Sequence, residues 1–79
     1  MDRIEQAVLE CLSAVAPDAD PASLAPDRPF HDQIEFDSVD FLNYVMKLER
    51  ILDVEIPEQD YPQLISLAGA VAYLTKATA

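Results

Sequence analysis

The stretch DSVDFLNYVMKLERILD, residues 37–53, determines the fold of this chain. At about 100° per residue, many of its apolar side chains fall within an arc of about 120°, which predicts a helix over residues 38–53 with one buried face. Asp37 is a suitable N-cap for this helix, and Asp40 is placed to complete a capping box with it. The core stripe of the helix consists of Phe41, Tyr44, Val45, Leu48, Ile51 and Leu52.

A second apolar face lies on the same helix, about 150° from the core stripe, and consists of Val39, Leu42 and Met46. The core of so small a domain cannot cover both sides of one helix. We therefore expect the second apolar face to be exposed, with Glu49 at its rim, as in a protein-binding surface. The alternative is that the loop before the helix covers Leu42 and Met46.

Two further helices are predicted on either side of this one. Over residues 3–16, apolar residues recur at intervals of three and four, with Asp2 as the N-cap and Pro17 ending the helix. Cys11 lies on the apolar stripe of that helix, so we expect it to be a core residue. Over residues 67–77 a similar stripe follows Ser66, which is a favourable N-cap.

The remaining segments are short or irregular. Residues 57–64 begin with Pro57 at the first helical position, and Pro62 limits the expected helix to about one turn. Residues 17–37 hold four of the six prolines, which disfavours helix and strand there. We expect this long loop to be anchored by Leu24, Phe30, Ile34 and Phe36. The prediction is a single all-α domain over residues 1–79, a small four-helix bundle of three main helices and one short helix with a long first loop.

Charge and composition exclude several classes of function. The 79 residues carry 15 acidic and 5 basic side chains, a net charge of −10, whereas binding to nucleic-acid backbone or anionic lipid needs a basic patch. One cysteine, Cys11, and one histidine, His31, are too few for a zinc site. The single glycine, Gly69, excludes a glycine-rich phosphate loop. We expect no metal and no nucleic-acid partner.

The sequence also lacks membrane and secretion signals. No apolar run approaches the roughly 18 residues that span a bilayer, and the N-terminus lacks a basic-then-apolar signal pattern. We therefore expect no membrane insertion, a cytoplasmic location, a monomer, and partners that carry basic patches.

Ser38 is expected in the first turn of the central helix, with its side chain exposed at a loop–helix junction. A phosphate attached there would meet free backbone N–H groups and the positive end of the helix dipole. The alternative is that serine is simply favoured at helix starts. We expect no catalytic residue, because a nucleophilic serine needs a base and the only histidine is His31 in the acidic loop.

Three motifs together resemble the acyl carrier protein family: IEFDSVDFL at 34–42, VMKLE at 45–49 and VEIP at 54–57. The resemblance covers essentially the whole chain. It implies a substrate and shuttle rather than an enzyme. A separate magnesium-dependent phosphopantetheinyl transferase would attach 4′-phosphopantetheine from coenzyme A to Ser38, and the thiol of that arm would carry an acyl group as a thioester. The helical bundle would also shelter the acyl chain between partners.

The resemblance further implies roles for individual residues. Asp37 and Asp40 would help to place the transferase and the helix start. Acyl-loading and acyl-transfer enzymes would dock on Val39, Asp40, Leu42, Met46 and Glu49. The chain departs from the family at Glu35, where glycine is usual, at Val39, where leucine is commoner, and in a helix that is less acidic because of Asn43, Lys47 and Arg50. These departures favour a specialised lipid, polyketide or aminoacyl pathway as much as fatty-acid synthesis.

Two alternatives stay open from the sequence. One is a carrier whose cargo is an aminoacyl or peptidyl group. The other is an unmodified acidic helical adaptor that binds a basic partner through the second apolar face and keeps its function in a Ser38→Ala variant. A hydrolase that uses Ser38 and His31 is the weakest hypothesis.

Overall fold

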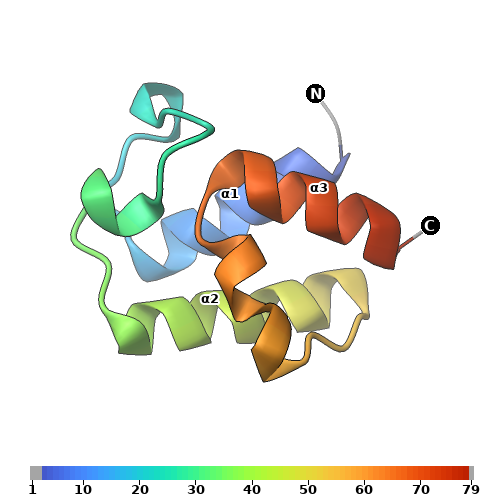
Figure 1. Ribbon diagram of the computed structural model, residues 1–79. Coiled ribbons are helices and arrows are strands. Elements are labelled where there is room, and N and C mark those ends of the chain that lie inside the picture. Colours follow the sequence, from blue (N-terminus) through green and yellow to red (C-terminus); the bar gives the residue numbers. More distant parts are fainter. Residues whose placement is uncertain (1–2, 79) are drawn as a thin grey trace.

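The computed structural model describes residues 3–78. Its frame is three α-helices (Figure 1): α1 Arg3–Val15, α2 Ser38–Leu52 and α3 Leu67–Ala77. Three 3-10 helices lie between them: η1 Pro21–Ser23, η2 Phe30–Asp32 and η3 Glu58–Leu64. Within residues 3–78 the only β pairing is an isolated bridge between Pro29 and Ser66. The predicted all-α class is therefore confirmed.

The three α-helices bury their apolar stripes against one another. α1 packs against both α2 and α3, and Cys11 on its inner face is only 1% exposed, as the sequence predicted. One contiguous core results, because buried residues of the long loop and of η3 join those of the helices. Its largest fully buried side chains are Tyr44, Phe30, Leu12, Leu48, Leu64, Leu74, Val8, Val45 and Cys11.

One predicted core residue lies at the surface. Ile51 is 48% exposed, so its assignment to the core stripe was wrong. The residue stands at the edge of that stripe, in the last turn of α2. The helix ends at the next residue, Leu52, and the left-handed backbone of the C-cap Asp53 (φ 53°) then turns the chain away.

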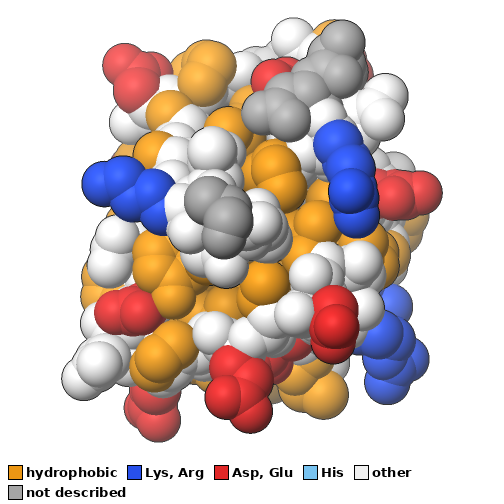
Figure 2. Space-filling model, turned by 90° about the vertical axis from the view of Figure 1, so that its right-hand side faces the viewer, with side chains coloured by type: hydrophobic (Ala, Val, Ile, Leu, Met, Phe, Trp, Pro, Cys, Tyr) orange, Lys and Arg blue, Asp and Glu red, His pale blue; other side chains and the backbone are white. Residues whose placement is uncertain are grey.

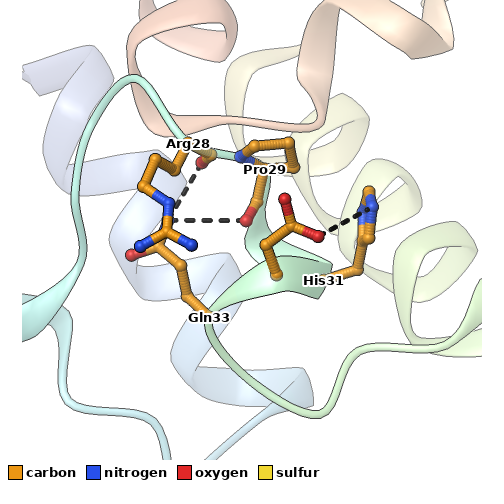
Figure 3. A network of polar contacts seen from close by, with 5 residues as sticks. Arg28, Pro29, His31 and Gln33 are labelled. Carbon is orange, nitrogen blue, oxygen red and sulfur yellow. Dashed lines mark hydrogen bonds and ion pairs between the residues drawn. The ribbon is translucent and has the colours of Figure 1, made fainter.

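The long loop between α1 and α2 is held by side chains. Leu24 and Phe30 are buried, and Ile34 and Phe36 pack against the core, as predicted. The amide of Gln33 also bridges the loop's backbone: it accepts a hydrogen bond from the Ala25 N–H at 2.6 Å and donates to the Ala25 carbonyl at 3.0 Å. It also donates to the Arg28 and Pro29 carbonyls at 2.9 and 3.4 Å (Figure 3). The loop therefore has a fixed path.

The same loop is tied to the junction between η3 and α3. The Phe30 N–H donates to the Ile65 carbonyl at 2.7 Å, and the Ala68 N–H donates to the Pro26 carbonyl at 2.8 Å. These bonds hold the loop against the start of α3, and the edge-to-face contact of Phe30 with Phe36 brings η2 beside the start of α2.

Several predicted helix bounds need correction, since α1 ends at Val15 rather than at residue 16 and α2 ends at Leu52 rather than at residue 53. Pro57 is the N-cap of η3 rather than its first helical residue, and η3 continues past Pro62 to Leu64. Its length is explained by tertiary contacts, since Leu64 is fully buried and the Tyr73 hydroxyl donates to the Asp60 carboxylate at 2.7 Å. The expected N-cap of α1, Asp2, lies outside the described residues.

The face on the right-hand side of the Figure 1 view carries acidic, basic and apolar side chains interspersed with one another (Figure 2). Among the described residues, no helix has both the length and the apolar character that crossing a lipid bilayer requires.

Candidate functional site

Ser38 is the first residue of α2, and its side chain is exposed. The preceding Asp37 is the N-cap: its Oδ1 accepts from the Asp40 N–H at 2.8 Å, and the Asp40 Oδ2 accepts from the Asp37 N–H at 3.4 Å. The predicted capping box is thereby confirmed. The N–H groups of a first helical turn lack partners within the helix, and they favour an anion beside them.

An aromatic cluster lies directly behind this helix start. The ring of Phe36 meets those of Phe30, Tyr44 and Phe41 edge to face, with centroids 5.7, 5.9 and 6.3 Å away. Phe41 in turn meets Tyr61 of η3 at 5.7 Å. Because Phe36 is two residues before Ser38, this packing fixes the backbone from which α2 begins.

A cavity of about 210 Å³ opens beside Ser38. Its apolar wall comes from the loop, from α2 and from the residue after η3, while its polar edge includes the serine itself. The lining residues are Phe30, His31, Phe36, Asp37, Ser38, Phe41 and Ile65. An attached group at Ser38 would therefore have an apolar hollow next to it.

His31 lines this cavity but is not arranged as a catalytic base. Its side chain is 59% exposed, and its Nε2 lies 3.5 Å from the Asp32 carboxylate (Figure 3). No hydrogen bond joins His31 to Ser38, although both belong to the described residues. The site thus lacks the serine–histidine contact that nucleophilic catalysis requires.

The second apolar face of α2 is exposed, as predicted. Val39 is 64%, Leu42 47% and Met46 60% exposed. The long loop does not cover them. Large apolar side chains exposed together on one helix face are typical of a protein-binding surface.

The two acidic residues at the rim of this face also have structural contacts. Asp40 completes the capping box described above, and the Glu49 Oε2 accepts from the Ile56 N–H at 2.9 Å. Both side chains are half-buried. Each therefore presents only part of its carboxylate to a docking partner.

Two other kinds of polar group within residues 3–78 bear on the choice of site. Among residues 3–78, no group of histidine, cysteine, aspartate and glutamate side chains could hold a metal ion. Burial, with a smaller contribution from nearby Glu10, raises the pKa of the Cys11 thiol from 9.0 to about 11. Cys11 is therefore a protonated core residue at neutral pH and not a nucleophile.

Sequence reasoning missed two features that shape the site. The first is the loop-bridging amide of Gln33, for which a lone glutamine gives no local signal. The second is the contribution of Tyr61 and Ile65, which reach the site because η3 packs against α2 at Phe41 and Tyr44. The spacing of Phe36, Phe41 and Tyr44 was the available signal for an aromatic cluster.

Comparison with known proteins gives a consistent result. A family model described as a phosphopantetheine attachment site matches residues 6–74. The chain is 32% identical over 79 residues to an acyl carrier protein of Caulobacter vibrioides, covering 100% of this chain and 95% of that protein. It is 28% identical over 79 residues to an acyl carrier protein of Rubrobacter xylanophilus, covering 96% and 95% respectively.

A further relative differs in length. The chain is 29% identical over 72 residues to a Schizosaccharomyces pombe protein named as a mitochondrial acyl carrier protein. The match covers 91% of this chain but only 64% of that protein. Its name leaves the predicted cytoplasmic location of this chain unconfirmed.

Proposed function

Because this chain belongs to the acyl carrier proteins, a family with a phosphopantetheine attachment site, we propose that Ser38 is the residue that bears the arm. The family's cofactor is 4′-phosphopantetheine, and its members are carriers rather than enzymes. The observation that carries the proposal is the exposed position of Ser38 as the first residue of α2, held by the Asp37–Asp40 capping box.

The residues around Ser38 fit such an arm. The hydroxyl is accessible to a modifying enzyme, the helix start favours the negative charge of a phosphodiester, and the adjoining cavity offers an apolar wall to the first carbon atoms. When bound, the arm supplies a thiol on which an acyl group is held as a thioester.

The attachment step needs little from the carrier itself. The Ser38 oxygen attacks a phosphorus of the coenzyme A diphosphate, forming a phosphodiester and releasing adenosine 3′,5′-bisphosphate. The serine proton passes to a base from outside this chain, and His31 beside the site lies 3.5 Å from the Asp32 carboxylate instead. The role of Ser38 is that of a substrate hydroxyl.

We propose that the loaded protein shuttles acyl thioesters between enzymes of a fatty-acid, polyketide or specialised lipid pathway, as a single-domain monomer in the cytoplasm. Partners dock on the second apolar face and its rim, which consist of Val39, Asp40, Leu42, Met46 and Glu49. The net charge of −10 favours partners with basic patches. An aminoacyl or peptidyl cargo is the alternative within the same mechanism.

The experiment that tests the attachment site is intact-mass spectrometry after incubation with coenzyme A, magnesium and a broad-specificity phosphopantetheinyl transferase. We expect the wild-type chain to gain the mass of one phosphopantetheine and Ser38→Ala to gain none. Ser23→Ala is the matched control, since Ser23 is also exposed and lies in a short helix. Loading of Ser38→Ala would contradict the proposal.

Docking is tested separately. Leu42→Ala and Met46→Ala should slow acyl loading of the holo protein by partner enzymes and leave its circular dichroism unchanged, because both side chains project into solvent. Folded wild-type protein that no transferase modifies would instead favour the unmodified adaptor.

A further inference from the structure

The exposed side of α2 carries a small basic patch beside the second apolar face. The patch consists of Lys47 and Arg50, and both side chains are exposed. They are two of only five basic residues in a chain that has 15 acidic ones. We propose that the acyl-handling enzyme that docks on α2 places a carboxylate against this patch. This inference rests on the proposed function, because it takes the second apolar face as the docking surface.

The basic patch directly borders the second apolar face. Counted at about 100° per residue from Val39, Arg50 lies about 20° and Lys47 about 80° around the helix. Arg50 follows the exposed Met46 by four residues, so the two side chains are neighbours on the helix surface. A partner that covers Met46 therefore also meets Arg50.

Lys47 lies on the side of α2 that packs against α1. Burial, and then Glu10, raise the pKa of the Cys11 thiol, whereas Lys47 lowers it. Such an effect requires Lys47 to lie near the inner face of α1, where Cys11 is buried. On the opposite side of the second apolar face, the carboxylate of Glu49 accepts a hydrogen bond from the Ile56 N–H. The two sides of the docking surface thus differ in charge.

The carrier itself does not neutralise the basic patch. Among residues 3–78, the contact within 4.0 Å between a basic and an acidic side chain is that of His31 and Asp32, so no carboxylate pairs with Lys47 or Arg50. These two residues are three positions apart, a spacing at which like charges on a helix repel each other. Arg50 is in the last turn, where a cation favours the helix dipole, but Lys47 is more than one turn from the end of α2 and gains no such benefit. Lys47 is therefore better explained by a partner than by the fold.

Charge complementarity indicates the chemistry of that partner. The start of α2 is acidic at Asp37 and Asp40, whereas its later turns are basic at Lys47 and Arg50. A matching enzyme surface has basic groups opposite the helix start and a carboxylate opposite the basic patch. Such a pattern fixes the orientation in which the carrier docks. It also disfavours an enzyme whose docking surface is basic throughout, because that surface would repel Lys47 and Arg50.

Carbodiimide cross-linking tests the pairing, because this reagent joins a lysine amine to a carboxylate when the two groups are in contact. The holo protein is mixed with an extract of its own cells, treated with a water-soluble carbodiimide and digested for mass spectrometry. The chain has two lysines, so Lys76 on α3 is an internal control. We expect Lys47 to be joined to an aspartate or glutamate of an enzyme that acts on acyl thioesters. The inference would be overturned if Lys47 stayed unlinked, or were linked no more often than Lys76.

Kinetics with the linked enzyme, once purified, test whether the contact selects the partner. Lys47→Glu should lower kcat/KM for acyl loading about tenfold, mainly by raising KM and more strongly at low salt. Replacing the linked carboxylate of the enzyme with lysine should restore loading of this variant. Circular dichroism should be unchanged, because Lys47 is exposed.

Lys76→Glu is the matched control, since it makes the same charge change at an exposed position of another helix. It should be loaded like the wild type. Equal effects of Lys47→Glu and Lys76→Glu would refute the role of Lys47 and leave only the net charge as the cause. Failure of the wild type to accept phosphopantetheine would refute the proposed function instead.

Discussion

The backbone N–H and the carboxylate of Asp37 both bond to Asp40, at 3.4 and 2.8 Å, so that Ser38 lies inside a closed cap. We predict that Asp37→Ala lowers the free energy of unfolding by about 1 kcal/mol, since the helix loses its N-cap acceptor. Asp37→Asn retains an acceptor oxygen and should lose less. Urea denaturation measures both variants, and equal stability of Asp37→Ala and wild type would contradict the stabilising role of this cap.

Gly69 is required by a close approach between α3 and the segment before it. A Cβ at this position would lie 2.7 Å from the Gln63 carbonyl oxygen and 3.0 Å from the Ser66 hydroxyl. We predict that Gly69→Ala destabilises the fold by about 1 kcal/mol net, although alanine is the better helix former. Ala72→Gly is the control at an exposed position of the same helix. It measures how much the difference in helix propensity between alanine and glycine alone changes the free energy of unfolding. A higher melting temperature for Gly69→Ala than for the wild type would contradict this prediction, because it would show that the backbone shifts to accept the added Cβ without loss of stability.

Alkaline pH should weaken the fold through Cys11. Burial raises its pKa from 9.0 to about 11, so above pH 9 the thiol ionises in the unfolded chain before it ionises in the folded one. Its contribution to the free energy of unfolding is therefore complete below pH 9 and is lost as the pH rises through about 11. We predict a fall of up to about 2 kcal/mol in the free energy of unfolding from this group over that range. Urea denaturation from pH 8 to 11 should show a shallower decline for Cys11→Ala. Parallel profiles for the two proteins would exclude the thiol as the cause.

The charge distribution predicts a dependence on salt. The net charge is −10 with histidine neutral, and between described residues the contact within 4.0 Å of a basic and an acidic side chain is that of the exposed His31 and Asp32, which is ionic only when His31 is protonated. Repulsion among acidic side chains should therefore destabilise the fold at low ionic strength. We predict that added sodium chloride raises the melting temperature at neutral pH. A melting temperature that stays flat across the titration would count against this account.

The sequence predicted the parts of this structure that depend on local patterns. The N-caps Asp37 and Ser66, the buried stripes of α1 and α3, and the exposure of Val39, Leu42 and Met46 follow from helical periodicity and capping chemistry. Ile51 was misassigned because periodicity cannot show where a neighbouring element stops covering a helix.

The features that could not be predicted depend on contacts between distant segments. Gln33 orders the long loop through bonds to the backbone of Ala25 and Arg28, and no local motif marks such a bridge. The same holds for Tyr61, which joins the aromatic cluster from η3. Ser38 was identified from its motif, but the cavity beside it required the positions of η2 and Ile65.

The central claim is tested most directly by fragmentation mass spectrometry of the protein purified from its own cells. The account predicts a peptide that contains Ser38 with a phosphopantetheine, or an acylated form of it, on that serine. The pantetheine portion should leave as a separate fragment, and the other serines should be unmodified. Full recovery of the unmodified Ser38 peptide, or a phosphopantetheine located on another serine, would contradict the account.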